Sequence, residues 1–218
     1  MFDDVFNTND AVWQSPAKSV TDDENKPIGN SNSGSKRRTT EVFELSNKYL
    51  YRRAFGEDIL LQKLGIEKFK DGHSYHCITG GNVDSLSFLK VILLHQNIEW
   101  LMCSTWCMAA EDIKQFEEWV DNGKIKKLDF YVGEIFPTSY VVEWRMLNDF
   151  YKRKKCGRIA AFKNHSKIYA GYGDKFPFVI ESSANINTNP RTEQGVITID
   201  RGLVDFYKNY FDKIKSYE

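Results

Sequence analysis

From Ser74 onward, short apolar segments alternate with amphipathic helical segments, and this alternation constrains the fold more than any other feature of the chain. Four of the apolar segments are bounded by polar or glycine residues, which is typical of strands. These expected strands are Ser74–Thr79, Ile98–Cys103, Leu128–Val132 and Arg158–Phe162. Strands that alternate with helices favour an α/β sandwich with helices on both faces of a mostly parallel mixed sheet.

Helical periodicity predicts the segments between and around these strands. Helices are expected over Glu41–Leu64 (one or two), after Gly80-Gly81 with Asn82 or Asp84 as the cap, over Ala109–Asn122, over Ser139–Tyr151 and over Gly202–Tyr217. The last of these is amphipathic and is expected to cover a sheet face. Its apolar residues near one side are Leu203, Phe206, Tyr210, Phe211 and Ile214.

Residues 1–40 differ in composition from the rest, being rich in Asn, Asp, Ser, Gly, Lys and Thr. Such a segment buries too little apolar surface to offset the entropy of ordering it. We therefore expect a disordered tail over 1–40, or an arm that orders on another protein, and one domain over 41–218. The basic cluster Lys36–Arg38 is interpreted as a solvated linker end, with contact to a polyanion as the alternative.

The overall charge sets limits on the function. The chain has 30 basic and 30 acidic residues and a formal net charge of zero, so a strongly basic nucleic-acid binder is not indicated, and any polyanion site would be a local patch. One such patch is predicted at Lys154 and Lys155, in the basic run before the strand that leads to His165. There these lysines would bind substrate phosphates at the mouth of a site.

The chain begins with an acidic segment and contains no apolar run long enough to cross a bilayer, so neither a secretory signal nor a membrane span is expected. Its four cysteines do not suggest a disulfide framework. A reducing, cytoplasmic location follows. Cys103 and Cys107 are four residues apart, but the spacing suits buried core cysteines better than zinc ligands, so no metal is expected.

The chemistry is concentrated between Asn164 and Gln194. His165 and Lys167 are two residues apart, so in an alternating strand both side chains would point to the same face. An imidazole can attack phosphorus, and an ammonium can hold phosphoryl oxygens. Ser183 and Asn185, also two apart, follow an expected strand over residues 178–181. Together these four residues are suited to hold and attack one phosphodiester without a metal.

This pattern, His-x-Lys followed by Ser-x-Asn after a strand, resembles the phospholipase D superfamily, which includes phospholipases, single-domain endonucleases and DNA-repair phosphodiesterases. The resemblance extends from Ser74 to the carboxy terminus, and its motifs lie between His165 and Glu193. The amino-acid sequence over residues 181–187 and 189–194 is most similar to small members of the superfamily that are carried by bacteriophages and mobile elements. The resemblance implies a phospholipase-D-like α/β/α sandwich.

The resemblance also implies a role for each motif residue. His165 would form a covalent phosphohistidine or act as its general-acid partner. Lys167 and Asn185 would bind the non-bridging oxygens, and Ser183 would orient groups within the site. Glu193 would match the downstream acidic residue that often fixes a catalytic histidine by hydrogen bonding.

The chain departs from the superfamily pattern at three points. Tyr172 stands where an acidic residue is usual, seven positions after the histidine, and Asp174 is not assigned its role. Ser182 replaces the glycine that usually precedes the motif serine. The superfamily uses two His-x-Lys pairs and this chain has one. The resemblance therefore implies a homodimer with the site on its two-fold axis, or a site that does not turn over.

We therefore hypothesise a cytoplasmic phosphodiesterase of a bacterial or phage-infected cell that needs no metal or cofactor. It would act on nucleic acid, with DNA the first expectation, as a homodimer. One alternative is a catalytically silent protein of the same fold that binds nucleic acid or a phage or mobile-element assembly. A second alternative is a lipid phosphodiesterase, although no membrane-docking surface is evident in the sequence.

Overall fold

A computed structural model describes residues 48–64, 69–81, 83–186 and 191–215 of the 218. The tail expected over 1–40, the Lys36–Arg38 cluster and the candidate cap Asn82 lie outside the described residues. So does the first part of the helical segment expected from Glu41.

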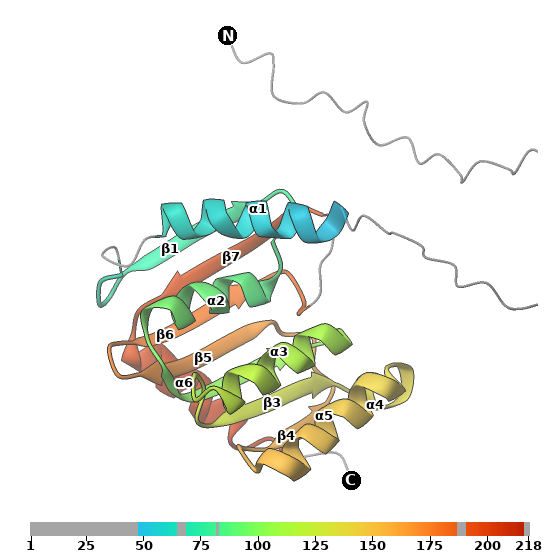
Figure 1. Ribbon diagram of the computed structural model, residues 1–218. Helices are drawn as coiled ribbons and strands as arrows, with labels where there is room; N and C mark the ends of the chain where they lie inside the picture. The colour runs from blue at the N-terminus through green and yellow to red at the C-terminus, as the bar shows by residue number, and fades with distance from the viewer. Residues whose placement is uncertain (1–47, 65–68, 82, 187–190, 216–218) are drawn as a thin grey trace, which may run out of the picture. The chain divides into compact units, whose positions relative to one another are not determined.

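Within the described residues, seven strands form one sheet with the order β1-β7-β6-β5-β2-β3-β4 (Figure 1). The strands are β1 (Ser74–Thr79), β2 (Ile98–Thr105), β3 (Leu128–Gly133), β4 (Ile159–Phe162), β5 (Ile168–Gly173), β6 (Pro177–Ser182) and β7 (Glu193–Thr198). The four strands predicted before His165 are all present, with ends that differ by two residues or fewer.

The sheet is mixed, as expected, but the expectation of mostly parallel pairing is wrong. β2, β3 and β4 pair in parallel, whereas the pairs β1–β7, β7–β6, β6–β5 and β5–β2 are antiparallel. The parallel strands are joined through helices, as parallel crossovers require. The connections from β5 to β6 and from β6 to β7 contain no helix, so these strands turn back beside one another as hairpins.

The helices lie on both faces of the sheet, which confirms the α/β/α sandwich. They are α1 (Lys48–Lys63), α2 (Ser85–His95), α3 (Ala110–Asp121), α4 (Phe136–Ser139), α5 (Val141–Lys154) and α6 (Arg201–Phe211). The larger core cluster contains residues of α1, α2, α3 and α5, while the smaller one contains Val204 and Phe211 of α6. Figure 1 shows α6 behind the sheet, across from α2 and α3.

Residue alternation along the strands explains the two layers. Leu101 and Cys103 of β2 face the larger cluster, and Trp100 and Met102, which alternate with them, face α6. Successive strand side chains point to opposite faces, so a strand buried on both sides is apolar throughout. β2 comes close to this pattern: seven of its eight residues are buried, namely Ile98 and the run from Trp100 to Thr105, which ends in two polar residues.

Local signals set several helix boundaries. Asp84 is the cap of α2, because its carboxylate accepts a hydrogen bond from the backbone N–H of Ser87 at 3.1 Å. The helix expected over Ser139–Tyr151 corresponds to α5, which begins after Tyr140, and the short α4 before it was not expected. α6 covers a sheet face as predicted, but two of its expected core residues are not buried: Phe206 is 62% exposed and Tyr210 is 56% exposed.

The topology brings one set of strand ends together. β6 runs in the same direction as β2, since each pairs antiparallel with β5. The carboxyl ends of β2, β3, β4 and β6 therefore meet the amino ends of β5 and β7 at one edge of the sheet. We call this the carboxyl edge, and the opposite one, where β2, β3 and β4 begin, the amino edge.

Candidate active site

The five predicted motif residues all lie at the carboxyl edge. His165 and Lys167 are in the connection between β4 and β5, Ser183 and Asn185 directly follow β6, and Glu193 is the first residue of β7. The expectation that His165 and Lys167 share an alternating strand is wrong, because β5 begins only at Ile168.

Backbone hydrogen bonds connect the three segments. The N–H of Ser182 donates to the carbonyl of Lys167 at 3.0 Å, and the N–H of Ser183 donates to the carbonyl of Gln194 at 3.1 Å. These bonds continue the β5–β6 and β6–β7 ladders by one step beyond the strands. The motif segments are therefore held side by side by the sheet itself.

Lys167 is directed at His165 rather than at solvent. Its side chain is buried, with 9% exposure, and its ammonium lies 3.0 Å from Nδ1 and 3.5 Å from Nε2 of the exposed His165 ring. It also donates to the His165 carbonyl at 2.7 Å. Burial lowers the pKa of Lys167, and the nearby Cys107 and Glu193 partly oppose this. A cation is thus held in a partly desolvated position beside an exposed imidazole.

Ser183 and Glu193 form a second polar pair. The Ser183 hydroxyl donates to the Glu193 carboxylate and accepts from the backbone N–H of Gln194, the latter at 3.0 Å. In the part of the chain that the structure describes, the His165 ring has hydrogen-bond contacts with Lys167 alone. Glu193 of the same chain therefore does not hold His165 in this arrangement.

Asn185 presents an unsatisfied group. Its amide oxygen is buried and has no hydrogen-bond partner among the residues described. Buried polar atoms without a partner are uncommon, because each costs the free energy of its lost hydration. Asn185 is two residues after Ser183, and its open atom is an acceptor, so a hydrogen-bond donor of a ligand would satisfy it.

The loop that carries His165 is anchored by Asn164, a residue to which the sequence analysis gave no role. The Asn164 amide nitrogen donates to the Ser104 hydroxyl and to the Tyr131 carbonyl, both at 2.9 Å. Its amide oxygen accepts from the backbone N–H of Ser166 at 3.0 Å and from the Ser166 hydroxyl at 2.7 Å. Asn164 thereby fixes the loop to the ends of β2 and β3. An amide residue between the apolar strand and the motif histidine was the available signal.

Trp106 forms the wall on one side of His165, with their ring centroids 5.5 Å apart. The close packing there depends on Gly133 at the end of β3. A Cβ atom on Gly133 would lie 2.6 Å from Cδ1 of Trp106 and 3.1 Å from the carbonyl oxygen of Asn164. Glycine at this position lets the Trp106 and Asn164 segments approach the strand.

On its other side His165 borders a pocket of about 330 Å³ between the β4–β5 connection and α6. Most of its lining outside the connection itself is aromatic: Phe162, Phe206, Tyr207, Tyr210 and Phe211. We refer to this as the aromatic pocket. The sequence analysis missed it, because it assigned the α6 aromatic residues to the core.

The two lysines proposed to bind substrate lie elsewhere. Lys154 ends α5 and Lys155 precedes β4, whereas His165 follows β4. A strand rises about 3.3 Å per residue, so the four residues of β4 place the two ends more than about 10 Å apart. The expectation that Lys154 and Lys155 flank the mouth of the His165 site is therefore wrong for a single chain. Lys154 instead pairs with Asp121 at 2.5 Å.

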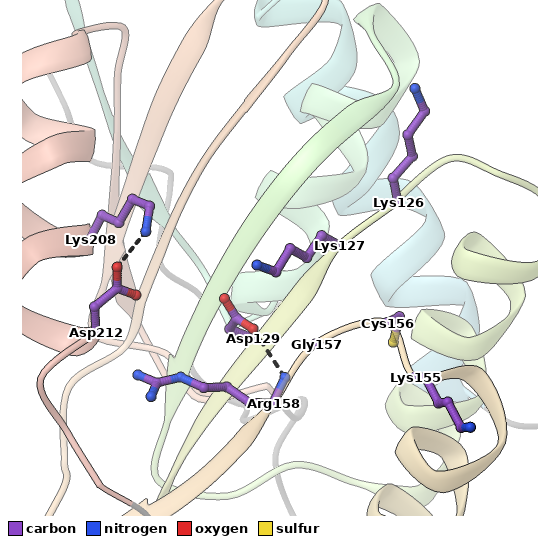
Figure 2. A pocket seen from close by; sticks show the side chains of 9 residues that line it. All are labelled: Lys126, Lys127, Asp129, Lys155, Cys156, Gly157, Arg158, Lys208 and Asp212. Carbon is purple, nitrogen blue, oxygen red and sulfur yellow. Dashed lines mark hydrogen bonds and ion pairs between the residues drawn. The ribbon is translucent and has the colours of Figure 1, made fainter.

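A larger and more charged pocket, of about 780 Å³, lies at the amino edge (Figure 2). Its charged lining residues are Lys126, Lys127, Asp129, Lys155, Arg158, Lys208 and Asp212. We call it the amino-edge pocket. Figure 2 shows Lys127, Arg158 and Lys208 around the two carboxylates, while Lys126 and Lys155 extend away.

Most of the charged groups of the amino-edge pocket have partners in the fold. Asp129 accepts from Nε1 of Trp100 at 2.8 Å and from the backbone N–H of Arg158 at 3.0 Å. The Arg158 guanidinium donates to the Tyr131 hydroxyl and to the Phe211 carbonyl. Lys208 pairs with Asp212. Five basic and two acidic side chains line the pocket, so it keeps a net positive charge, although Asp129, Arg158 and Lys208 have partners within the fold.

The described residues contain no group of three or more His, Cys, Asp or Glu side chains that is arranged to hold a metal ion. Cys103 is fully buried in β2, and burial raises the pKa of its thiol well above the usual value. Among the helices that the structure describes, none has the length and apolar character needed to cross a membrane.

The architecture is similar to parts of two larger proteins of known structure. Polyphosphate kinase from Porphyromonas gingivalis superimposes with a TM-score of 0.52 and 15% identity, over 73% of this chain and 29% of that one. Phosphatidylserine synthase from Haemophilus influenzae Rd KW20 superimposes with a TM-score of 0.50 and 12% identity, over 65% of this chain and 39% of that one. No protein-family model and no characterised protein sequence matches the chain.

The chain thus spans less than two fifths of the length of either structural relative. At this level of identity the similarity establishes the fold. The chain has the phospholipase-D-like α/β/α sandwich that the motif resemblance implied.

Proposed function

We propose that this protein is a metal-independent phosphodiesterase of the phospholipase D type that acts on nucleic acid. The observation that carries the proposal is the placement of Lys167, whose buried ammonium is directed at the exposed ring of His165. Burying a cation is costly unless it has partners. An anionic phosphodiester beside His165 would supply the missing negative charge.

The residues around His165 support each step of phosphoryl transfer. The Lys167 ammonium and the amide nitrogen of Asn185 donate to the two non-bridging oxygens and stabilise the charge that develops on them in the transition state. One His165 nitrogen attacks phosphorus, and the bond from phosphorus to the leaving oxygen breaks. Water then attacks the phosphohistidine, which releases a phosphomonoester and restores the imidazole.

The leaving oxygen needs a proton, and a second copy of the chain would provide it. Each chain supplies one His-x-Lys pair, and His165 is exposed at the carboxyl edge. In a two-fold dimer His165 of the partner subunit would act as the general acid. Glu193 lies at the same edge without a bond to its own His165, so it is available to orient the imidazole of the other copy.

The names of the structural relatives support phosphorus chemistry in general, since one is a kinase of polyphosphate and the other a synthase of a phospholipid. Nucleic acid is proposed as the substrate because the motif sequence is most similar to small phage and mobile-element proteins. The predicted cytoplasmic location of the protein belongs to the same proposal.

A second candidate is a silent protein that binds nucleic acid without cleaving it. The observation that favours it is the contact of Lys167 with the imidazole, since the ammonium lies within 3.5 Å of both ring nitrogens. In this arrangement neither nitrogen is directed toward a substrate. Catalysis requires the ring to turn so that one nitrogen faces phosphorus.

Incubation with single- and double-stranded DNA in excess EDTA tests the proposal. Wild-type protein is expected to cleave, and His165→Ala is expected to lose cleavage by at least about 100-fold, the lower range for removal of an acid–base group. His76→Ala, at an exposed histidine of β1, is the matched control and should retain full activity.

The alternatives give different results in the same experiment. DNA that is retarded and not cut would favour the silent binding protein. Cleavage that persists in His165→Ala, or that EDTA abolishes, would contradict the histidine mechanism. A monomer in light scattering of the wild-type protein would contradict a site that is shared between two subunits.

A further inference from the structure

The aromatic pocket beside His165 has properties that the proposed chemistry does not require. Phe206 and Tyr210 are four residues apart on α6 and lie on the same side of the helix. They are 62% and 56% exposed, although Val204 and Phe211 already anchor α6 to the sheet. Their rings therefore contribute little to the core and are available to a ligand.

The pocket wall between these rings and the sheet is fixed. The Tyr207 hydroxyl donates to the Glu181 carboxylate on β6, and burial together with that carboxylate raises the pKa of Tyr207. The rings of Phe206 and Tyr207 pack edge to face, with centroids 5.2 Å apart. A ligand in the pocket would meet an ordered aromatic surface.

The opposite wall is polar and belongs to the motif loop. Lys163, Ser166 and His165 line the pocket there, and Lys163 is exposed at the rim. One ligand in the pocket would thus touch aromatic rings on one side and a cation, a hydroxyl and the candidate nucleophile on the other. A nucleotide has this distribution of chemistry, with a flat base next to an anionic phosphate.

We infer that the aromatic pocket binds an unpaired nucleobase, which stacks on Phe206 and Tyr210 while the adjacent phosphodiester lies at His165. The volume of about 330 Å³ falls at the lower end of the range of about 300–1,000 Å³ that is usual for small-ligand pockets. Aromatic platforms beside a positively charged path are the common means of binding single strands. This inference rests on the proposed function and specifies its substrate as single-stranded.

Stacking in this pocket predicts a preference for single-stranded over duplex nucleic acid. In a duplex each base is already stacked and paired, so insertion into the pocket requires unpairing and flipping it. A single strand offers the base at no such cost. Single-stranded DNA should therefore bind more tightly than duplex DNA of the same length and sequence.

The test compares Phe206→Ala/Tyr210→Ala with Leu94→Ala, which removes a similarly exposed apolar side chain (61%) from α2. Fluorescence anisotropy with a labelled oligothymidylate is expected to show dissociation about tenfold or more weaker for the double variant, with Leu94→Ala unchanged. Binding to a duplex should change by less than about twofold in both variants. The conservative pair Phe206→Tyr and Tyr210→Phe should retain binding.

Binding is measured separately from cleavage, so the inference and the proposed function can fail independently. If the wild-type protein binds single strands and cuts nothing, a loss in the double variant still supports the pocket. Equal losses for duplex and single strand would overturn the inference, as would no loss at all. A double variant that changes from dimer to monomer would identify the occupant as a second copy of the chain.

Two further controls address other occupants and folding. Wild-type protein that binds phosphatidylglycerol vesicles in place of oligothymidylate would overturn the inference in favour of a lipid. Far-UV circular dichroism identifies any double variant that does not fold. In that case the single variants Phe206→Ala and Tyr210→Ala should each weaken single-strand binding by several-fold, and unchanged binding in both would overturn the inference.

Discussion

The sites at the two edges of the sheet differ in how far their polar and charged groups have partners within the fold. At the amino edge, the pocket is larger and richer in charge, yet Asp129 and Arg158 have hydrogen-bond partners within the fold, and Lys208 pairs with Asp212 on the surface. At the carboxyl edge there are fewer charges. There, however, the hydrogen bonds of the Lys167 ammonium within the described residues all go to His165, and the Asn185 amide oxygen has no partner in that region.

The difference shows that neither cavity size nor charge density identifies a site. Charged groups that satisfy one another stabilise structure, and each can be explained without a ligand. Groups that are ordered, partly desolvated and left without a structural partner indicate a ligand that the chain does not contain. By this criterion the smaller carboxyl-edge site is the better candidate for a functional site.

The sharpest test of the comparison removes one lysine from each edge. Lys167→Met should lower phosphodiesterase activity by about 10²–10³-fold, since the variant loses a donor to the transition-state oxygens. It should not lower the free energy of unfolding, because an apolar side chain replaces a buried cation. Cleavage rate and urea denaturation together measure both.

Lys155→Met at the amino edge is the control and should cleave within about twofold of wild type, because surface lysines away from the chemistry have small effects. If both variants lost activity equally, the amino-edge pocket would have to belong to the substrate path. The comparison of the edges would then be wrong.

The converse test targets stability at the amino edge. Asp129→Ala leaves the buried Trp100 indole and the Arg158 backbone N–H without their acceptor, and each loss costs about 1–3 kcal/mol. We expect a destabilisation of about 2–3 kcal/mol in urea denaturation, with activity per folded molecule unchanged.

Asp212→Ala is matched to this variant, because Asp212 lines the same pocket but is exposed and pairs with Lys208 on the surface. Its cost should be below about 1 kcal/mol. An activity loss in folded Asp129→Ala protein would show that the two edges are coupled.

The smallest expected effect is a pH dependence at the carboxyl edge. Burial lowers the pKa of Lys167 below its ordinary value of 10.5, so the folded chain binds fewer protons there than the unfolded chain between the lowered pKa and 10.5. Stability from this group therefore rises as the pH increases through that range. Unfolding free energies of wild type, measured against pH, should rise relative to those of Lys167→Met. A constant difference would contradict the burial of this cation.

Much of the fold was predictable from local pattern. β1 has the bounds that its alternation predicts, and α3 differs from its expected range by one residue at each end. The strand order was not predictable in this way, because it depends on pairings between segments far apart in sequence, such as Tyr75 with Ile197. The expectation that most strand pairs would be parallel was wrong for this reason.

The candidate site was predictable to the extent that it depends on a motif. His165, Lys167, Ser183 and Asn185 were found by their spacing and Glu193 through the motif resemblance, and the structure places all five at one edge. Contributions from tertiary packing were not readable. Asn164 anchors the loop through bonds to β2 and β3, and Phe206 is exposed on a helix whose apolar pattern predicted burial.

The pairing of β1 with β7 has a consequence for how the protein is made. β1 is an edge strand whose one neighbour in the described sheet is β7, and Thr79 pairs with Glu193 across more than a hundred intervening residues. During synthesis on the ribosome, β1 lacks this partner until β2 to β6 have been synthesised and β7 follows. Because β7 also carries Glu193, the last of the described strands to be synthesised both fills the place between β1 and β6 and completes the candidate site. A nascent chain that has not reached β7 therefore lacks both the pairing partner of β1 and one residue of the candidate site, so the order of synthesis determines when this edge of the sheet can form.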